Sequence, residues 1–241
     1  MVLFTDLDMD RYHAELRCEV GMAFADEGLL DRAESEFEAA LEYVDGFPEA
    51  LFGLGLIYVA RGSLEEAEEK FLEFMEAEPA DCRGPLELSR VYLSTGDGTG
   101  ALDMASWAHD LSPDEPAIWM QMARSAVAAG DTTLAETWLV RTVSGDQALE
   151  AEARVFLAEI RRLRGLDGEA RELLLPAVSD GYPPALWMLA GIYLDWGDHM
   201  RAVDTIRRYL AAAPCGEMAD SALLVLEELA ESGEYIPPDS P

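Results

Sequence analysis

Basic residues are scarce in this sequence. Lys and Arg make up 17 of the 241 residues against 48 Asp and Glu, so the formal net charge is −31. A nucleic acid is therefore excluded as a direct ligand, because neutralising phosphate groups requires a basic surface. An anionic membrane surface would repel the chain in the same way. A basic or neutral protein partner suits this charge, because the field of the protein would accelerate their encounter. The alternative is that the charge only keeps the protein soluble.

Cysteine and long apolar runs are also lacking. Cys18, Cys82 and Cys215 are far apart and show no C-x-x-C spacing, which argues against a disulfide framework and against a zinc site. Reduced thiols in a cytoplasmic protein are the simplest expectation. The first residues are acidic where a signal peptide would be basic and then apolar. No uninterrupted apolar stretch reaches the roughly 18 residues that a membrane-spanning helix requires.

Motifs of catalysis are missing too. His13, His109 and His199 are isolated, and no spacing joins them into a metal site. The sequence contains no GxxxxGK[ST], HExxH or GxSxG motif. The string GDGTG at residues 96–100 resembles a phosphate loop, but it lacks a preceding strand and a lysine, so it predicts a turn. We therefore expect no enzyme, no cofactor and no metal; an acidic metal-dependent enzyme is the least favoured alternative.

A repeat of 34 residues organises the chain. Half of the residues are apolar, enough to bury a core, and Ala, Leu and Glu favour helix over strand. Gly21 and Gly55 are 34 residues apart, and Phe37 and Phe71 have the same separation. With small shifts the register continues through Tyr92, Gly96, Ala101, Ala108, Pro113, Gly130, Ala135, Gly165, Ala170, Ala177, Tyr193, Gly197, Ala202 and Pro214.

Each repeat predicts two amphipathic helices, because its apolar residues recur at spacings of three and four. In the second repeat, the first helix runs from about Pro48 to Arg61, and Gly62 leaves it with a positive φ. Ser63 caps the next helix in a capping box with Glu66. The small Ala67 allows the two helices to approach, and Phe71 fills the space beside it. Since a single hairpin cannot bury its own apolar face, the units must stack.

These residues resemble the tetratricopeptide repeat family, with its pattern W-x2-L-G-x2-Y followed by A-x3-F and a closing proline. The second repeat matches best, whereas Ala126 replaces the usual tyrosine in the fourth and Leu157-Ala158 marks a degenerate fifth. The resemblance implies an all-α fold, a right-handed α-α superhelix of about six hairpins with a C-terminal capping helix. The expected divisions are a lead-in at 1–13, repeats at 14–47, 48–81, 82–115, 116–149, 150–182 and 183–216, a capping helix at 217–232 and a flexible tail at 233–241.

The family binds partners in a groove lined by the first helix of each hairpin, and the resemblance places a partner site there. Arg90 and Arg124 occupy the same place in successive repeats, and Arg161 or Arg162 would extend the row. Arginine forms paired hydrogen bonds with carboxylates, so our hypothesis is a groove for an extended or helical peptide with acidic groups. The alternative is that the arginines pair with local acids, such as Glu87 and Glu159. The predicted groove residues are Phe52, Leu56, Arg83, Arg90, Met120, Arg124, Arg162 and Trp187, with Glu15, Cys18, Met22 and Glu49 also on the groove face.

The expected function is that of a non-catalytic scaffold or adaptor in a bacterial cytoplasm that binds a protein or peptide. A self-associating assembly module and an acidic chaperone of a bacterial secretion system are the alternatives. The carboxylate clamp of heat-shock chaperone adaptors is not expected, because only Arg83 of its corresponding positions has the right charge. A run of acids from Asp31 to Glu78 on the second helices offers either a docking surface for a basic protein or a solvated helix face.

Overall fold

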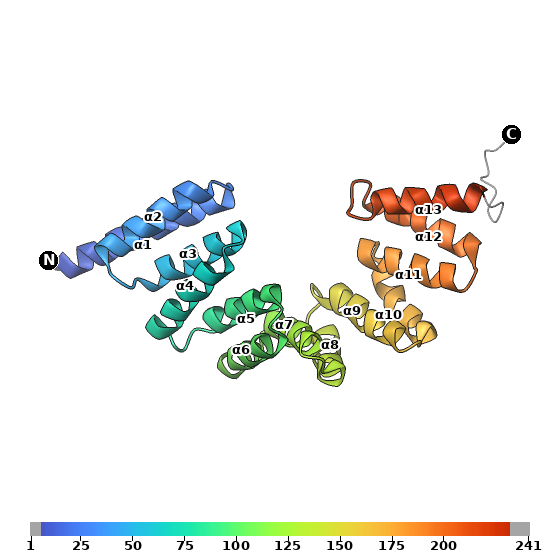
Figure 1. Cartoon of the computed structure of the whole chain (residues 1–241), viewed down its shortest axis with the longest axis horizontal. Helices are drawn as coiled ribbons and strands as arrows, with labels where there is room; N and C mark the ends of the chain where they lie inside the picture. The colour runs from blue at the N-terminus through green and yellow to red at the C-terminus, as the bar shows by residue number, and fades with distance from the viewer. Residues whose placement is uncertain (1–5, 232–241) are drawn as a thin grey trace. The chain divides into compact units, whose positions relative to one another are not determined.

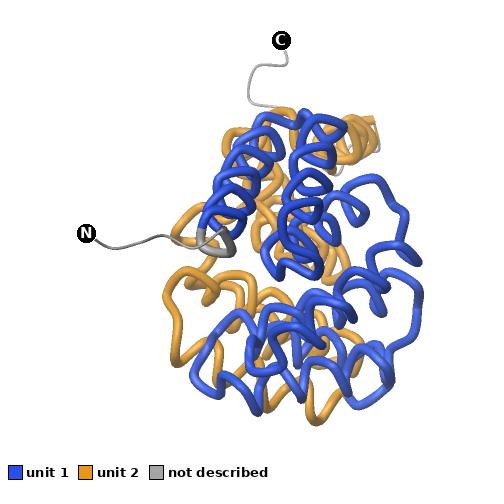
Figure 2. Tube along the Cα trace, turned by 90° about the vertical axis from the view of Figure 1, so that its left-hand side faces the viewer, with its two compact units in different colours: residues 1–131 blue, residues 132–241 orange. Residues whose placement is uncertain are grey.

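A computed structural model describes residues 6–231, and all regular secondary structure within this range is helical. The chain divides into two compact units, residues 1–131 and 132–241, which Figure 2 distinguishes by colour. Unit 1 contains α1 (Asp6–Asp26), α2 (Leu30–Tyr43), α3 (Pro48–Arg61), α4 (Leu64–Ala77), α5 (Arg83–Thr95), α6 (Gly98–Leu111) and α7 (Pro116–Ala128). Unit 2 contains α8 (Thr132–Gly145), α9 (Glu150–Leu163), α10 (Asp167–Ser179), α11 (Pro183–Asp195), α12 (His199–Ala212) and α13 (Ala219–Glu231).

Unit 1 is a stack of helical hairpins. The short turns between α1 and α2, α3 and α4, and α5 and α6 reverse the chain, and the two helices of each pair pack together (Figure 1). The second helix of each pair also contacts the first helix of the next, so α2 packs on α3, α4 on α5 and α6 on α7. First helices meet as well, α1 with α3 and α5 with α7. This arrangement places successive first helices along one side of the unit.

Unit 2 repeats the same design. Helices α9 and α10 form one hairpin and α11 and α12 another, while α8 packs on α9 and α13 on α12. Fully buried Leu174, Leu186 and Ile206 come from three successive helices and fill the core between the hairpins. The fifth repeat, degenerate in sequence, is thus a regular hairpin.

The cores of the first two hairpins explain the recurring spacing of glycine and phenylalanine in unit 1. Phe71 is fully buried, and a Cβ atom built on Gly55 would lie only 2.5 Å from its ring. Gly21 has the same relation to Phe37, at 2.9 Å. Glycine is therefore required where the phenylalanine of the second helix crosses the first helix. The predicted burial of Ala67 and Phe71 is confirmed.

The turns between paired helices confirm some of the predicted signals. Gly62 ends α3 with φ of +77°, as expected for a left-handed C-terminal residue. The 96–100 segment is a turn and helix start, where the Asp97 side chain accepts a hydrogen bond from the Gly100 amide and so caps α6. The capping box at Ser63 is wrong: Ser63 precedes α4, but its side chain makes no capping hydrogen bond.

Three predicted boundaries differ from the structure. Helix α1 begins at Asp6, so residues 6–13 are helical instead of a lead-in. The units divide between Asp131 and Thr132, inside the predicted fourth repeat, because α7 packs with α5 and α6 whereas α8 packs with α9. The capping helix spans Ala219–Glu231, and the predicted tail at 233–241 lies outside the described residues.

Helix α13 covers the last hairpin with only part of its apolar surface. Leu229 is buried against Val203, and Leu226 packs against the same cluster. Leu223 and Leu224 of the same helix are 51% and 57% exposed. The difference arises because residues three, four or seven positions apart share a helix face, and Leu223 and Leu224, six and five positions before Leu229, fall outside that face.

Candidate functional site

A groove on unit 1 brings together α1, α3 and the first residue of α5. It encloses about 660 Å³, within the range of pockets that hold small ligands or parts of a peptide. We call it the α1–α3 groove. Its lining residues are Arg11, Glu15, Cys18, Glu19, Met22, Ala23, Asp26, Phe47, Glu49, Phe52 and Arg83.

The floor of the groove is apolar. Cys18 and Phe47 are buried, Phe52 is half-buried, and Met22 is 42% exposed at the surface. The Phe52 ring rests on Phe74 at a centroid distance of 5.1 Å, so the hairpin core holds it in place. Burial, with smaller effects of Glu49 and Glu15, raises the pKa of the Cys18 thiol to about 12, so this side chain stays neutral and lines the groove as an apolar group. The floor therefore offers a preformed surface for an apolar side chain.

Both arginines of the groove already have carboxylate partners. Arg83 donates from Nε and Nη2 to Asp81 Oδ2 at 2.9 and 2.7 Å, and its guanidinium lies 4.8 Å from the Phe52 ring centroid. Partial burial raises the pKa of Asp81, but the hydrogen bonds and charge of Arg83 outweigh this effect and the net pKa is lowered. Arg11 pairs with Glu15 one turn away, at 3.1 Å. Neither guanidinium is presented to a ligand as an unpaired cation.

Fewer of the carboxylates of the groove than of its arginines have an ion-pair partner. Glu15, Glu19 and Asp26 come from α1, and Glu49 comes from α3. Among the described residues, Glu19, Asp26 and Glu49 are exposed and take part in no ion pair. The rim of the α1–α3 groove is therefore acidic above an apolar floor.

The structure places the predicted groove residues in different environments. Phe52 and Arg83 lie in the α1–α3 groove, together with Glu15, Cys18, Met22 and Glu49 from the predicted groove face. Leu56 is half-buried and packs against the cluster around Phe71. The sequence showed the spacing of these positions but did not show that they enclose a cavity.

Met120 corrects the expectation of an exposed apolar groove residue. Its side chain is only 2% exposed, and every residue from 118 to 123 in α7 is buried. A helix that is buried on most of its circumference serves as core, because it has no free face to present. The signal was available in the sequence, where α7 carries Ile118, Trp119, Met120 and Met122 in close succession.

A buried polar network next to the predicted arginine row went unnoticed in the sequence. Gln121 Nε2 donates to Ser89 Oγ at 2.9 Å, Ser89 Oγ donates to the Ala101 carbonyl at 2.8 Å, and Ser89 and Ser125 are 3.1 Å apart. These bonds join α5, α6 and α7. Arg90 is exposed beside Ser89 and pairs with Glu87, as the local-acid alternative predicted, while Arg124 is half-buried.

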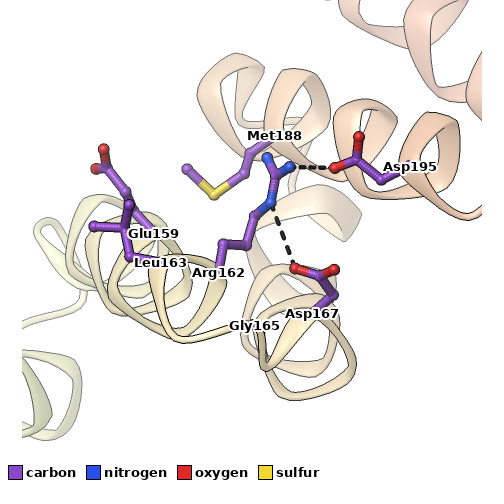
Figure 3. Close-up of a pocket in the computed structure, with 7 residues that line it drawn as sticks. All are labelled: Glu159, Arg162, Leu163, Gly165, Asp167, Met188 and Asp195. Carbon is purple, nitrogen blue, oxygen red and sulfur yellow. Dashed lines mark hydrogen bonds and ion pairs between the residues drawn. The ribbon is translucent and has the colours of Figure 1, made fainter.

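Arg162 lies in a cavity of about 430 Å³ in unit 2 (Figure 3). Its Nη2 is 2.5 Å from Asp195 Oδ2 and its Nε is 3.7 Å from Asp167 Oδ1, so the guanidinium lies between two carboxylates from neighbouring helices (Figure 3). Arg161 pairs with Glu136 at 2.9 Å. The local-acid alternative therefore holds here too, although the partners are not Glu159.

Trp187 lines a second, mainly apolar cavity of unit 2, of about 370 Å³. Its ring packs on Tyr209 at a centroid distance of 5.6 Å, and Tyr209 is nearly buried and accepts a hydrogen bond from the Met218 amide. Glu217 is the single charged residue of this lining. Trp187 is thus half-buried: it packs within the hairpin and also forms part of the cavity wall.

Within residues 6–231, no group of three or more His, Cys, Asp or Glu side chains is placed to hold a metal ion. None of the described helices has both the length and the apolar character needed to cross a bilayer.

Stacked antiparallel hairpins with a groove along their first helices define an α-helical repeat protein. Residues 20–81 match the model of the tetratricopeptide repeat, and the described chain has the fold of proteins built from this repeat. The family-model match and the shared fold confirm the resemblance to tetratricopeptide repeat proteins seen in the sequence. A search of curated protein sequences found no match.

Solved structures share the fold at low sequence identity. PilW, described as a widely conserved type IV pilus biogenesis factor, is 18% identical with a TM-score of 0.75, over 87% of this chain and 98% of PilW. YrrB, described as a TPR protein with an unusual peptide-binding site, is 17% identical with a TM-score of 0.56, over 79% of this chain and 97% of YrrB. A chain of the APC/C hetero-tetramer Cut9–Hcn1 is 16% identical with a TM-score of 0.70, over 88% of this chain. This chain spans only 42% of that one.

Proposed function

We propose that the protein is a non-catalytic interaction module that holds a peptide segment of a partner protein in the α1–α3 groove. The tetratricopeptide repeat fold generally mediates protein–protein interaction. The observation that carries the proposal is the cavity of about 660 Å³, whose floor combines the exposed Met22 with the half-buried Phe52. YrrB, of similar fold, is described as binding a peptide, which supports the same use of the fold here.

An apolar side chain of the partner would insert against Met22 and Phe52. Burying such a side chain is worth roughly 1.5–3 kcal/mol. Association itself costs an estimated 4 kcal/mol or more, so one anchor does not give a stable complex. Several residues of the partner must therefore lie along α1 and α3, which an extended or helical segment achieves.

A random peptide library selected on the full chain provides the test. The peptides obtained are titrated by fluorescence anisotropy against the natural sequence, against Met22→Gln, and against Met200→Gln as a matched control. Met200 is an exposed methionine of α12 in unit 2, and both changes keep side-chain length and charge. Met22→Gln is expected to weaken binding about tenfold, equivalent to about 1.4 kcal/mol of lost apolar contact, and Met200→Gln to leave it unchanged. Selection of no peptide, or equal effects of the two substitutions, would contradict the proposal.

Self-association is a second candidate, favoured by the exposed Leu223 and Leu224 of α13. Exposed apolar side chains at the end of a stack are suited to burial against another copy. Light scattering over a hundredfold range of concentration would reveal a dimer, and Leu223→Glu with Leu224→Glu would abolish it. A mass that stays monomeric throughout rules this candidate out.

A further inference from the structure

The charge of the α1–α3 groove determines which peptides it can hold. Glu15, Glu19 and Asp26 lie on the side of α1 that lines the groove, and 11 residues of helix place the first and last about 16 Å apart. Glu15 and Glu19 are one turn apart, a spacing at which like charges repel. Glu49 adds a fourth carboxylate from α3. A cationic ligand would relieve this repulsion.

The arginines of the groove are not available to bind an acidic ligand, because each already pairs with a carboxylate of the protein. Asp81 accepts both side-chain hydrogen bonds of Arg83 and also one from the Arg83 amide, at 2.8 Å. An acidic peptide would have to displace Asp81 from Arg83 while it approaches Glu49. A basic peptide displaces no ion pair when it meets Glu19, Asp26 or Glu49, since none of the three forms one within the described residues, although the charge of Glu49 acts on Arg83.

We infer that the α1–α3 groove recognises a peptide segment in which lysine or arginine residues flank an apolar side chain. This inference rests on the proposed function and names the chemistry of its partner. The apolar side chain contacts Met22 and Phe52, while the basic groups meet Glu19 and Asp26 from α1 and Glu49 from α3. It reverses the expectation from the sequence, in which arginines of the groove meet acidic groups of the partner. The net charge of −31 further accelerates the encounter with a basic segment.

The test uses three sets of nine-residue peptides that differ only in charge. Each peptide has a central leucine with two Lys, two Gln or two Glu beside it and random residues elsewhere. The best binders of each set are titrated against the full chain in 0.05 and 0.3 M salt. We expect the Lys set to bind at least tenfold more tightly than the Gln set at low salt, the Glu set to bind most weakly, and the difference to shrink at high salt because exposed charges are screened.

Two matched triple variants locate the effect. Glu19→Gln, Asp26→Asn and Glu49→Gln remove three exposed, unpaired carboxylates of the groove. Glu65→Gln, Glu69→Gln and Glu76→Gln make the same change in net charge on exposed positions of α4, outside the groove lining. Since exposed pairs are worth about 1.5- to fivefold each, the groove variant is expected to lose about tenfold in affinity for the Lys set, and the α4 variant to lose less than twofold. Circular dichroism and thermal unfolding check that both variants remain folded.

The outcomes separate the inference from the proposed function. Tightest binding by the Glu set, weakened by Met22→Gln, would overturn the preference for basic peptides and leave the groove as the binding site. Equal losses in the two triple variants would also overturn it, because the charge of the whole chain would then account for the preference. If none of the three sets binds and the random library is also empty, the proposed function fails and the inference fails with it.

Discussion

The α1–α3 groove of unit 1 and the Arg162 cavity of unit 2 differ in how their arginines and carboxylates are paired. In the groove, both arginines are paired and three carboxylates have no ion-pair partner within the described residues. In the cavity, Asp195 and Asp167 flank the single guanidinium, and Glu159 also belongs to the lining, so carboxylates exceed the one cation (Figure 3). The charge that a surface offers to a ligand is therefore set by the charges left over after local pairing, and the presence of an arginine in a groove does not by itself predict an acidic partner.

The largest expected effect is a loss of stability in unit 1, from a substitution in the core of the α3–α4 hairpin. In Gly55→Ala the new methyl group would lie 2.5 Å from Phe71, a buried ring that cannot move away, so we expect a loss of about 1–3 kcal/mol in the free energy of unfolding. Gly168→Ala in α10 is the control, because no atom lies within 4 Å of its Cβ position; it should be neutral or stabilising by about 0.4–1 kcal/mol. Denaturant titration gives the two energies. Relative to the natural chain, amide hydrogen exchange in Gly55→Ala should accelerate more in α3 and α4 than in α11 and α12. An equal acceleration in all helices would contradict a local effect.

Removing the carboxylate partner of Arg83 should increase the affinity of the α1–α3 groove for acidic peptides, which is the preference expected from the sequence. Asp81→Asn removes the charge that holds the guanidinium, at a cost of up to about 1 kcal/mol in stability for this partly exposed pair. Because the folded-state pKa of Asp81 is lowered, its contribution is present above its unfolded pKa and is lost as pH falls through the lowered value. The measurable gain is affinity for the Glu set of peptides, and a variant that binds these no better than the natural sequence would show that Arg83 does not set the charge preference.

A smaller effect concerns Glu87, whose pKa is raised whereas that of Asp81 is lowered. Burial raises this pKa and the charge of Arg90 opposes the rise only partly. The stability that Glu87 contributes is therefore full below its unfolded pKa of about 4.3 and is lost as pH rises through the higher folded value. Glu87→Gln should remove this component, so that unfolding free energy falls less between pH 4 and pH 7 than in the natural chain. Urea titrations at several pH values measure the difference, and parallel pH profiles would refute the role of Glu87.

The smallest expected effect is at the Arg162 cavity. The Arg162 and Asp195 side chains are 32% and 55% exposed, and such pairs contribute less than about 1 kcal/mol. Asp195→Asn should therefore change the midpoint of thermal unfolding by only a few degrees and leave peptide affinity at the α1–α3 groove unaltered. A marked loss of peptide binding in this variant would show that the two surfaces do not act separately.

Local signals in the sequence were reliable where the physics is local. Gly62 leaves its helix with a positive φ, and Phe71 with Ala67 forms the hairpin core, because these outcomes depend on residues within one repeat. The 34-residue register likewise predicted the helix order. Ser63 shows the limit of this reasoning, since it precedes α4 as expected but its side chain makes no capping hydrogen bond.

Predictions that required the position of one helix against another were less successful. Met120 occupies a groove-facing register position but is buried, and Arg162 is engaged by Asp195 from another helix. Of the predicted groove residues, Phe52 and Arg83 share one cavity. Asp195 is 33 residues from Arg162 in sequence, so no local pattern identifies the pair.

By itself the sequence determined the all-α hairpin repeat, its period and the acidic character of the protein, because helix propensity, glycine turns and net charge are properties of short segments or of composition. The tertiary structure decided which carboxylates and arginines are neighbours, where apolar side chains line a cavity, and that the units divide after Asp131. Those outcomes depend on side chains from different helices meeting in space, since pairing and burial act over a few ångströms regardless of separation along the chain.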